Sequence, residues 1–134
     1  MTEQEFKAKA TELIQLMVNT IADKEYTKLV LSIPPKSSWA LWNDAEPTPE
    51  NVCMGFGQWL DEQLAMWEED HDEKFVVDHF EESCLLEEIE LENDNTSFVT
   101  YRPTNSGEEL DFCFEIEFKV EEDGRITTVF DVNI

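Results

Sequence analysis

The chain has 134 residues, of which 32 are Asp or Glu and only nine are Lys or Arg, so its formal net charge at pH 7 is -23. A chain of this length can bury a core as one domain, residues 1–134, and a hydrophobic content of 41% places it outside the disordered class. The charge excludes nucleic acid and anionic membranes as direct partners, because phosphate groups attract Lys and Arg and repel carboxylates.

The cysteines and the first residues predict a cytoplasmic protein. Cys53, Cys84 and Cys113 are odd in number, widely spaced and set among apolar residues, which suits reduced thiols better than a disulfide framework. The opening MTEQEF lacks the basic and apolar regions of a secretory signal. No apolar run reaches the roughly 18 residues that a membrane span requires, so we expect no membrane association.

The N-terminal third predicts a helix followed by a hairpin. Thr2 and Glu5 form a capping-box pattern, and apolar residues at steps of three and four predict a helix that ends near Ala22. The segment 26–33 is β-branched and apolar, and two prolines end it. We expect the segment 38–43 to return beside it as an antiparallel strand.

A second helix is predicted after the proline-rich loop. Thr48 and Pro49 fit the cap and the first position of a helix, and the apolar spacing continues to Trp67. Gly55 and Gly57 weaken the first two turns, since glycine costs about 1 kcal/mol relative to alanine inside a helix. These glycines could instead mark the close approach of another backbone.

A third helix is predicted by the capping pattern of Asp70 and Glu73 and by the apolar residues that follow. We expect it to reach about Glu90. The end is ambiguous, because residues 87–92 (EEIELE) also alternate as a half-buried strand does.

The C-terminal third changes to a period of two. The segments 97–102, 110–120 and 125–132, separated by turn sequences, predict a three-strand meander whose middle strand has one apolar and one acidic face. The element order is α-ββ-αα-βββ. We therefore expect an α+β fold in which an antiparallel sheet of about five strands packs against two to three helices.

The densest charge lies between Asp61 and Asp94, where fifteen carboxylates accompany one cation, Lys74. If this stretch forms two adjacent helices, it carries one carboxylate per about 1.7 Å of axis, close to the charge density of duplex DNA. We expect this surface to bind a basic protein. The acids assigned to that contact are Glu68, Glu69, Asp70, Asp72, Glu81, Glu82, Glu87 and Glu88.

Tryptophans are the candidates for anchoring such a contact. Charge mainly sets the association rate and the choice of partner, whereas tight complexes depend on a few buried Trp, Tyr or Arg side chains. Trp39 and Trp42 lie on or beside the proline-bounded loop and are assigned to partner binding. The alternative is that they fill the core, as we expect of Trp59 and Trp67.

No pattern for catalysis or for a cofactor stands out. The Asp-rich runs lack the glycine and the third ligand of an EF-hand, and the cysteines lack the paired spacing of a zinc site. Only two histidines, His71 and His79, are present, and neither lies beside a nucleophile turn. We expect no enzymatic activity and no cofactor, with weak calcium or magnesium condensation on the acids as an alternative.

The small size, the lack of catalytic groups, the cytosolic character and the acidic surface together resemble the general profile of bacterial toxin-immunity proteins, including those of contact-dependent and polymorphic toxin systems. No family motif carries this resemblance, so it implies no site residues. It implies an inhibitor that occludes the active site of a basic toxin, such as a nuclease. Two alternatives are a DNA-mimic regulator or anti-defence protein that binds a DNA-binding protein, and a housekeeping adaptor whose acids serve solubility alone.

Overall fold

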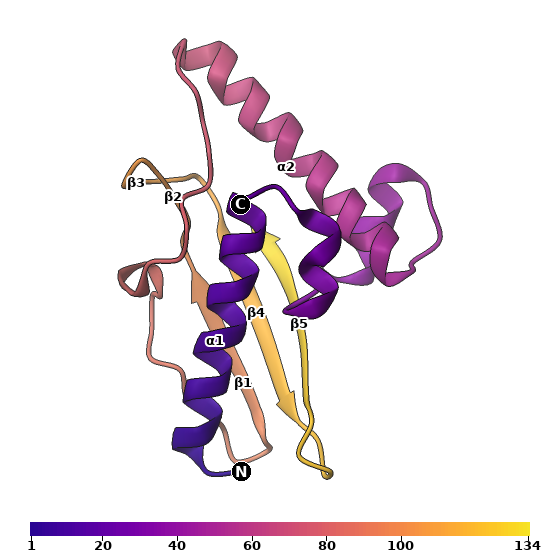
Figure 1. Ribbon diagram of the computed structural model, residues 1–134, viewed down its shortest axis with the longest axis vertical. Helices are drawn as coiled ribbons and strands as arrows, with labels where there is room; N and C mark the ends of the chain where they lie inside the picture. The colour runs from indigo at the N-terminus through magenta and orange to yellow at the C-terminus, as the bar shows by residue number, and fades with distance from the viewer.

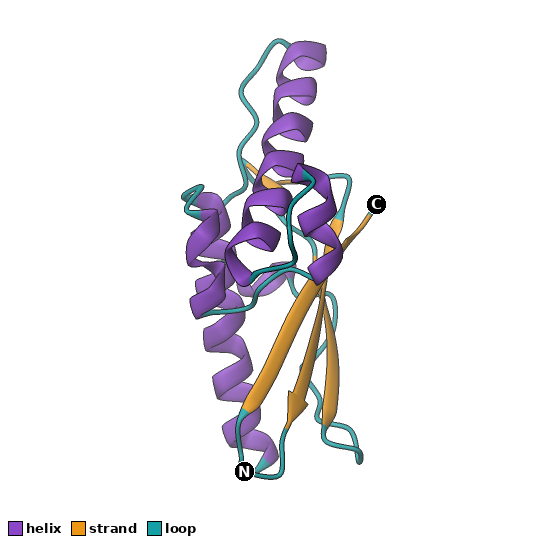
Figure 2. Ribbon diagram, turned by 90° about the vertical axis from the view of Figure 1, so that its right-hand side faces the viewer, coloured by secondary structure: helices purple, strands orange, loops and turns teal.

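The computed structural model, which describes residues 1–134, places helices on one face and at one end of an antiparallel sheet (Figure 1, Figure 2). The α+β class is confirmed. The elements in chain order are α1 (Glu3–Ala22), the 3₁₀ helices η1 (Tyr26–Leu31) and η2 (Ser37–Asn43), α2 (Pro49–His71), the 3₁₀ helix η3 (Glu82–Cys84), β1 (Thr96–Tyr101), β2 (Thr104–Asn105), β3 (Glu108–Glu109), β4 (Cys113–Val120) and β5 (Ile126–Asn133). No helix combines the length and the apolar character that crossing a bilayer requires.

The C-terminal meander is confirmed. The main sheet has the order β1-β4-β5, with β4 antiparallel to both neighbours, and β2 and β3 form a separate small hairpin between β1 and β4. In β4 the buried residues alternate with exposed ones, as its period of two predicts. Phe114, Ile116 and Phe118 are buried, whereas Glu117 and Lys119 are exposed.

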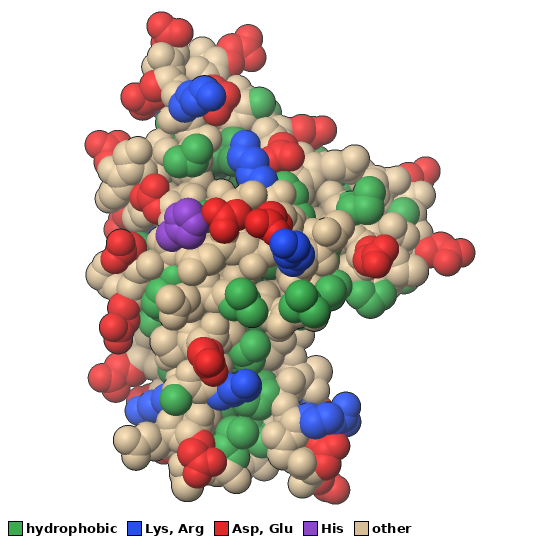
Figure 3. Space-filling view, in the orientation of Figure 1, with side chains coloured by type: hydrophobic (Ala, Val, Ile, Leu, Met, Phe, Trp, Pro, Cys, Tyr) green, Lys and Arg blue, Asp and Glu red, His purple; other side chains and the backbone are tan.

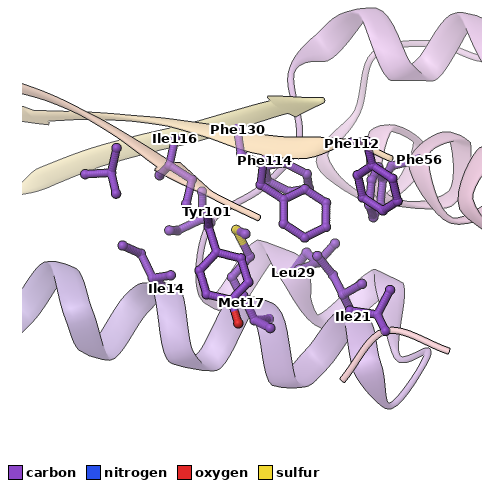
Figure 4. Packing of buried hydrophobic residues seen from close by; sticks show 14 of the residues in the cluster. Ile14, Met17, Ile21, Leu29, Phe56, Tyr101, Phe112, Phe114, Ile116 and Phe130 are labelled. Carbon is purple, nitrogen blue, oxygen red and sulfur yellow. The ribbon is translucent and has the colours of Figure 1, made fainter. Parts of the chain in front are cut away.

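The core lies between this sheet and α1. Figure 4 shows Ile14, Met17 and Ile21 of α1 facing the inner side of the sheet, where Ile116 and Phe130 point toward them. All five side chains are 0% or 1% exposed. The predicted apolar stripe of the first helix is therefore the surface that holds α1 on the sheet.

The predicted hairpin over 26–33 and 38–43 is wrong, because both segments form 3₁₀ helices that pack on α2. Gly55 lies against the backbone of η2, where a Cβ would be 1.7 Å from the carbonyl oxygen of Trp39. Gly57 lies against the ring of Tyr26. The glycines thus mark close approaches to α2, and this packing overrides the β propensity of the two segments.

The predicted third helix is also wrong. Asp72 takes a left-handed conformation, with φ 54° and ψ 34°, which ends α2 and turns the chain back. Residues 72–92, here called the return segment, run back along the molecule with no helix except η3 (Figure 1). Alternation continues in its last part, since Ile89 is buried while the flanking glutamates are exposed. The strand-like alternative for 87–92 describes this backbone better than a helix does.

Candidate partner-binding surface

The residues assigned to partner binding lie in three regions of the structure. Glu68, Glu69 and Asp70 are at the end of α2, and Asp72 is the turn that follows. Glu81, Glu82, Glu87 and Glu88 lie further along the return segment, and Trp39 and Trp42 are in η2. In Figure 3, carboxylates gather at the tip of α2 and along the edge where Figure 1 shows the return segment.

No ion pair neutralises this stretch. The structure has six ion pairs of Lys or Arg and one contact of His79 with Asp23, and none of the seven includes any of the fifteen acids between Asp61 and Asp94. Lys74, the single cation there, is exposed and also forms none. The charge of this region is therefore not neutralised by ion pairs within the chain.

Four of these acids nevertheless have structural partners, and one of them, Asp94, accepts hydrogen bonds from the backbone N–H and the hydroxyl of Thr96. Asp61 accepts a hydrogen bond of 2.7 Å from the hydroxyl of Tyr26, and together with burial this contact raises the pKa of Tyr26. Glu68 accepts a hydrogen bond of 3.2 Å from the backbone N–H of Phe75 and so fixes the start of the return segment. Glu68 is half-buried, which makes it the least available of the predicted contact acids.

Asp78 is the most heavily bonded of the four acids. Its carboxylate accepts hydrogen bonds from the Thr104 hydroxyl at 2.7 Å, the Gly107 N–H at 2.9 Å and the Ser106 N–H at 3.0 Å. Burial raises the pKa of Asp78, but the bonds from Gly107, Thr104 and Ser106 outweigh it, so that the pKa lies below its usual value. Asp78 thus ties the return segment to the β2–β3 hairpin.

The return segment spreads its charge more widely than two helices would. It carries nine acids in 21 residues, and eight of the nine are exposed. At a rise of about 3.3 Å per residue in an extended chain, their mean spacing is roughly 8 Å. The expected match to duplex DNA, about 1.7 Å per charge, required two helices and does not hold for this backbone.

The two tryptophans of η2 have different environments. Trp39 is half-buried, packs against Trp59 with 5.3 Å between ring centroids, and donates a hydrogen bond of 3.1 Å from Nε1 to Oδ1 of Asp131. Trp39 therefore has the core role that is the alternative to partner binding. Trp42 is 48% exposed beside Leu41, which is 75% exposed, and is therefore free to anchor a partner.

The remaining tryptophans have the core roles expected of them. Trp59 is 5% exposed, and the half-buried Trp67 stacks on Phe112 with 5.9 Å between ring centroids.

The open face of the sheet is a further candidate surface. The sequence predicts that it is solvent-exposed and acidic but does not predict a binding site there. Phe98 of β1 lies on it and is 51% exposed. A hollow there is bordered by Glu87 and Glu92 of the return segment. The sequence does indicate that Phe98 faces outward, because side chains of a strand alternate between its two faces and the neighbouring Ser97 and Val99 are buried. Nothing in the sequence near Phe98 predicts that the return segment lies beside β1.

The groups capable of chemistry are scattered. His79 lies 2.8 Å from Asp23 on the surface, and no hydrogen bond joins either histidine to a cysteine. All three cysteines are free thiols; Cys53 and Cys113 are buried as predicted, and burial raises the pKa of Cys53 to about 11. No group of three or more His, Cys, Asp or Glu side chains is placed to hold a metal ion.

No protein-family model, no curated protein and no solved structure matches this chain.

Proposed function

We propose that this protein is a non-catalytic inhibitor of a basic protein, and that it acts as an immunity protein that occludes the active site of a bacterial toxin such as a nuclease. The observation that carries the proposal is the set of fifteen acids between Asp61 and Asp94 without a single ion pair. Such a surface repels itself in the free protein. A basic partner relieves that repulsion and is attracted from a distance, which raises the association rate about 10- to 1,000-fold at low salt.

The spread of the acids favours irregular complementarity to the surface of a basic protein over mimicry of a nucleic-acid backbone. A DNA mimic must present charges at the regular, close spacing of phosphates, and the return segment has a mean spacing of roughly 8 Å. A protein surface has no such repeat and can match an irregular one. The exposed Trp42 beside Leu41 adds an apolar contact of the kind that holds protein complexes together.

The test is capture of a partner from lysate of the host, treated with nuclease, on immobilised protein. Washes are stepped up to about 0.5 M salt, where exposed charges more than a few ångströms apart no longer interact. We expect one basic protein to remain through the last wash and to carry a toxin activity, such as cleavage of nucleic acid, that added inhibitor abolishes. Release of many basic proteins together at moderate salt would contradict the proposal and favour an acidic surface that serves solubility.

Two quadruple variants make the test specific to the return segment. In the first, Glu81, Glu82, Glu87 and Glu88 are changed to Gln; in the control, the same change is made at Glu46, Glu50, Glu108 and Glu122. All eight side chains are exposed and lack ion pairs, so both variants lose four charges without losing a contact. We expect the first to lose inhibition and the control to retain it. Equal loss in both variants would assign the effect to net charge alone.

A further inference from the structure

We propose that the open face of the sheet is where the basic partner docks, and that this face receives an arginine side chain between Phe98 and Glu117. The inference rests on the proposed function in that it takes the partner to be a basic protein. It assigns to that partner a chemical feature, a guanidinium group, and to this chain a surface that receives it.

The register of the three strands gives the layout of this face. Phe98 of β1 is paired with Glu117 of β4, and Glu117 is paired with Val129 of β5, so the three side chains form a row across the sheet. The neighbouring outward rows are Thr96, Lys119 and Thr127 on one side and Thr100, Glu115 and Asp131 on the other. Figure 2 shows that the helices lie on the opposite side of the sheet, so no helix of this chain covers the row.

The row lies in a hollow of about 660 Å³. Glu87 and Glu92 line the hollow beside β1, so that together with Glu117 three acidic residues share it with the exposed Phe98. Lys119 is the one cation that lines it. The hollow thus combines an apolar floor with a net negative border, which is complementary to a positively charged side chain with a flat, weakly hydrated surface.

Arginine fits this pair of groups better than lysine does. Side chains paired across two strands have Cβ atoms about 4.5 to 5.5 Å apart, so a single side chain can reach the ring of Phe98 and the carboxylate of Glu117 together. A guanidinium group stacks on an aromatic face and donates two parallel hydrogen bonds to a carboxylate, whereas an ammonium group is a strongly hydrated point charge.

The existing contact of Glu117 does not block this role. Lys36 lies 3.7 Å from Glu117, and the two side chains are 42% and 48% exposed. An exposed pair of this kind contributes about 0 to 1 kcal/mol, so a bidentate arginine contact can replace it.

A second copy of this chain is a poor occupant of the face. Two copies would bring acidic borders together, each on a molecule of charge -23, and like charges across an interface oppose association. The face also lies between the two groups that the sequence assigned to binding. Glu87 borders it on the β1 side, and Trp39 bonds to Asp131, which faces outward on β5.

The experiment uses two peptides of equal charge, hexa-arginine and hexa-lysine, titrated into the isotope-labelled full chain at low ionic strength and followed by NMR. We expect the largest shift changes at the outward residues of the row, and hexa-arginine to bind about two- to fivefold more tightly than hexa-lysine. Phe98→Leu, which keeps an apolar side chain, should abolish that difference. Glu117→Gln should weaken hexa-arginine binding more than Glu50→Gln, a matched loss of one exposed charge on α2 outside the stretch from Asp61 to Asp94.

The outcomes separate this inference from the proposed function. Shift changes confined to the return segment or to α2, or equal affinities with no effect of Phe98→Leu, would overturn the sheet-face assignment while a basic partner still binds elsewhere. No binding of either peptide would count against both proposals. A concentration-dependent dimer with the same residues perturbed in the absence of peptide would overturn the assignment in favour of a second copy.

Discussion

The Cα of Gly55 lies so close to the carbonyl oxygen of Trp39 that a Cβ there would be 1.7 Å from that oxygen. This contact fixes η2 against α2 and is made by backbone, which cannot move aside as a side chain can. We expect Gly55→Ala to lower the free energy of unfolding by about 2 kcal/mol or more, because overpacking outweighs the gain in helix propensity of about 1 kcal/mol. Urea unfolding followed by tryptophan fluorescence measures it.

Gly57→Ala is the matched comparison. A Cβ at Gly57 would meet the ring of Tyr26, with 2.3 Å to Cδ2, and a ring can turn aside where a carbonyl cannot. We therefore expect a smaller loss than for Gly55→Ala. The Tyr26→Ala background should remove most of the cost of Gly57→Ala, and an undiminished cost in that background would contradict the assigned clash.

The bonds of Asp78 predict a pH dependence of stability. Its pKa is lowered in the folded protein, so its contribution is present above the unfolded value of about 4 and is lost as the pH falls through the lower folded value. Asp78→Asn should lower the free energy of unfolding at pH 7 by about 1 to 2 kcal/mol, since a charged acceptor of three hydrogen bonds is lost. The difference between the two proteins should shrink below about pH 4.

The comparison of wild type with Asp78→Asn is needed because the other acids respond to pH as well. Their mutual repulsion in a chain of charge -23 falls as they are protonated, which acts on both proteins alike and cancels in the difference. A difference that stays constant down to pH 3 would show that the carboxylate charge of Asp78 is irrelevant to its bonds with the β2–β3 hairpin.

The error of the predicted third helix has a physical origin, which is that backbone donors in this segment bond to acceptors far away in the sequence. The N–H of Val76 donates to Oδ1 of Asn105, and that of Phe80 donates to Oδ1 of Asn19, 29 and 61 residues away. These partners satisfy backbone groups that a third helix would have bonded internally. No window of sequence around Phe80 contains them, so the apolar spacing there predicted a helix.

The sequence predicts an element correctly where its apolar residues follow a single period and only one of its faces is buried. In β4, alternate apolar residues from Phe114 to Phe118 leave only one face for the core, and the strand follows. Charge is equally visible in sequence, and so the acidic character of the return segment was predictable. The hollow at Phe98 was not predictable, because it forms only where the return segment lies beside β1.

Salt is expected to stabilise the protein more than calcium does. Screening weakens repulsion among the exposed acids, so about 0.5 M NaCl should raise the melting temperature by several degrees. Millimolar calcium should raise it no more than magnesium at the same concentration, since no set of acids is placed to hold a metal ion. Calorimetric or fluorescence melts measure both. A large rise specific to calcium would indicate a bound ion.

Charge reversal on the return segment should act on association kinetics. We expect Glu81, Glu82, Glu87 and Glu88 changed together to Lys to slow association with the partner about 10-fold or more at low salt, because these exposed side chains steer the encounter. The melting temperature should not fall, since none of the four forms an ion pair. Stopped-flow measurements that show an unaltered association rate would remove this surface from the interface.

Trp39 and Trp42 are neighbours in η2, with 6.4 Å between ring centroids, yet they should respond differently to removal. Trp39→Ala opens a gap beside Trp59 and leaves Asp131 without its donor, so we expect a loss of about 3 kcal/mol in the free energy of unfolding. Trp42 is 48% exposed, and Trp42→Ala should cost less than about 1 kcal/mol.

Binding should show the opposite order. If Trp42 anchors the partner, Trp42→Ala should raise the dissociation rate about 10-fold or more while leaving the association rate nearly unchanged, because apolar anchors act after the encounter. Surface plasmon resonance with the captured partner measures both rates. Unchanged dissociation of the Trp42→Ala protein would leave Phe98 as the exposed aromatic side chain to test at the interface, since it lies on the sheet face with Glu117 and Val129.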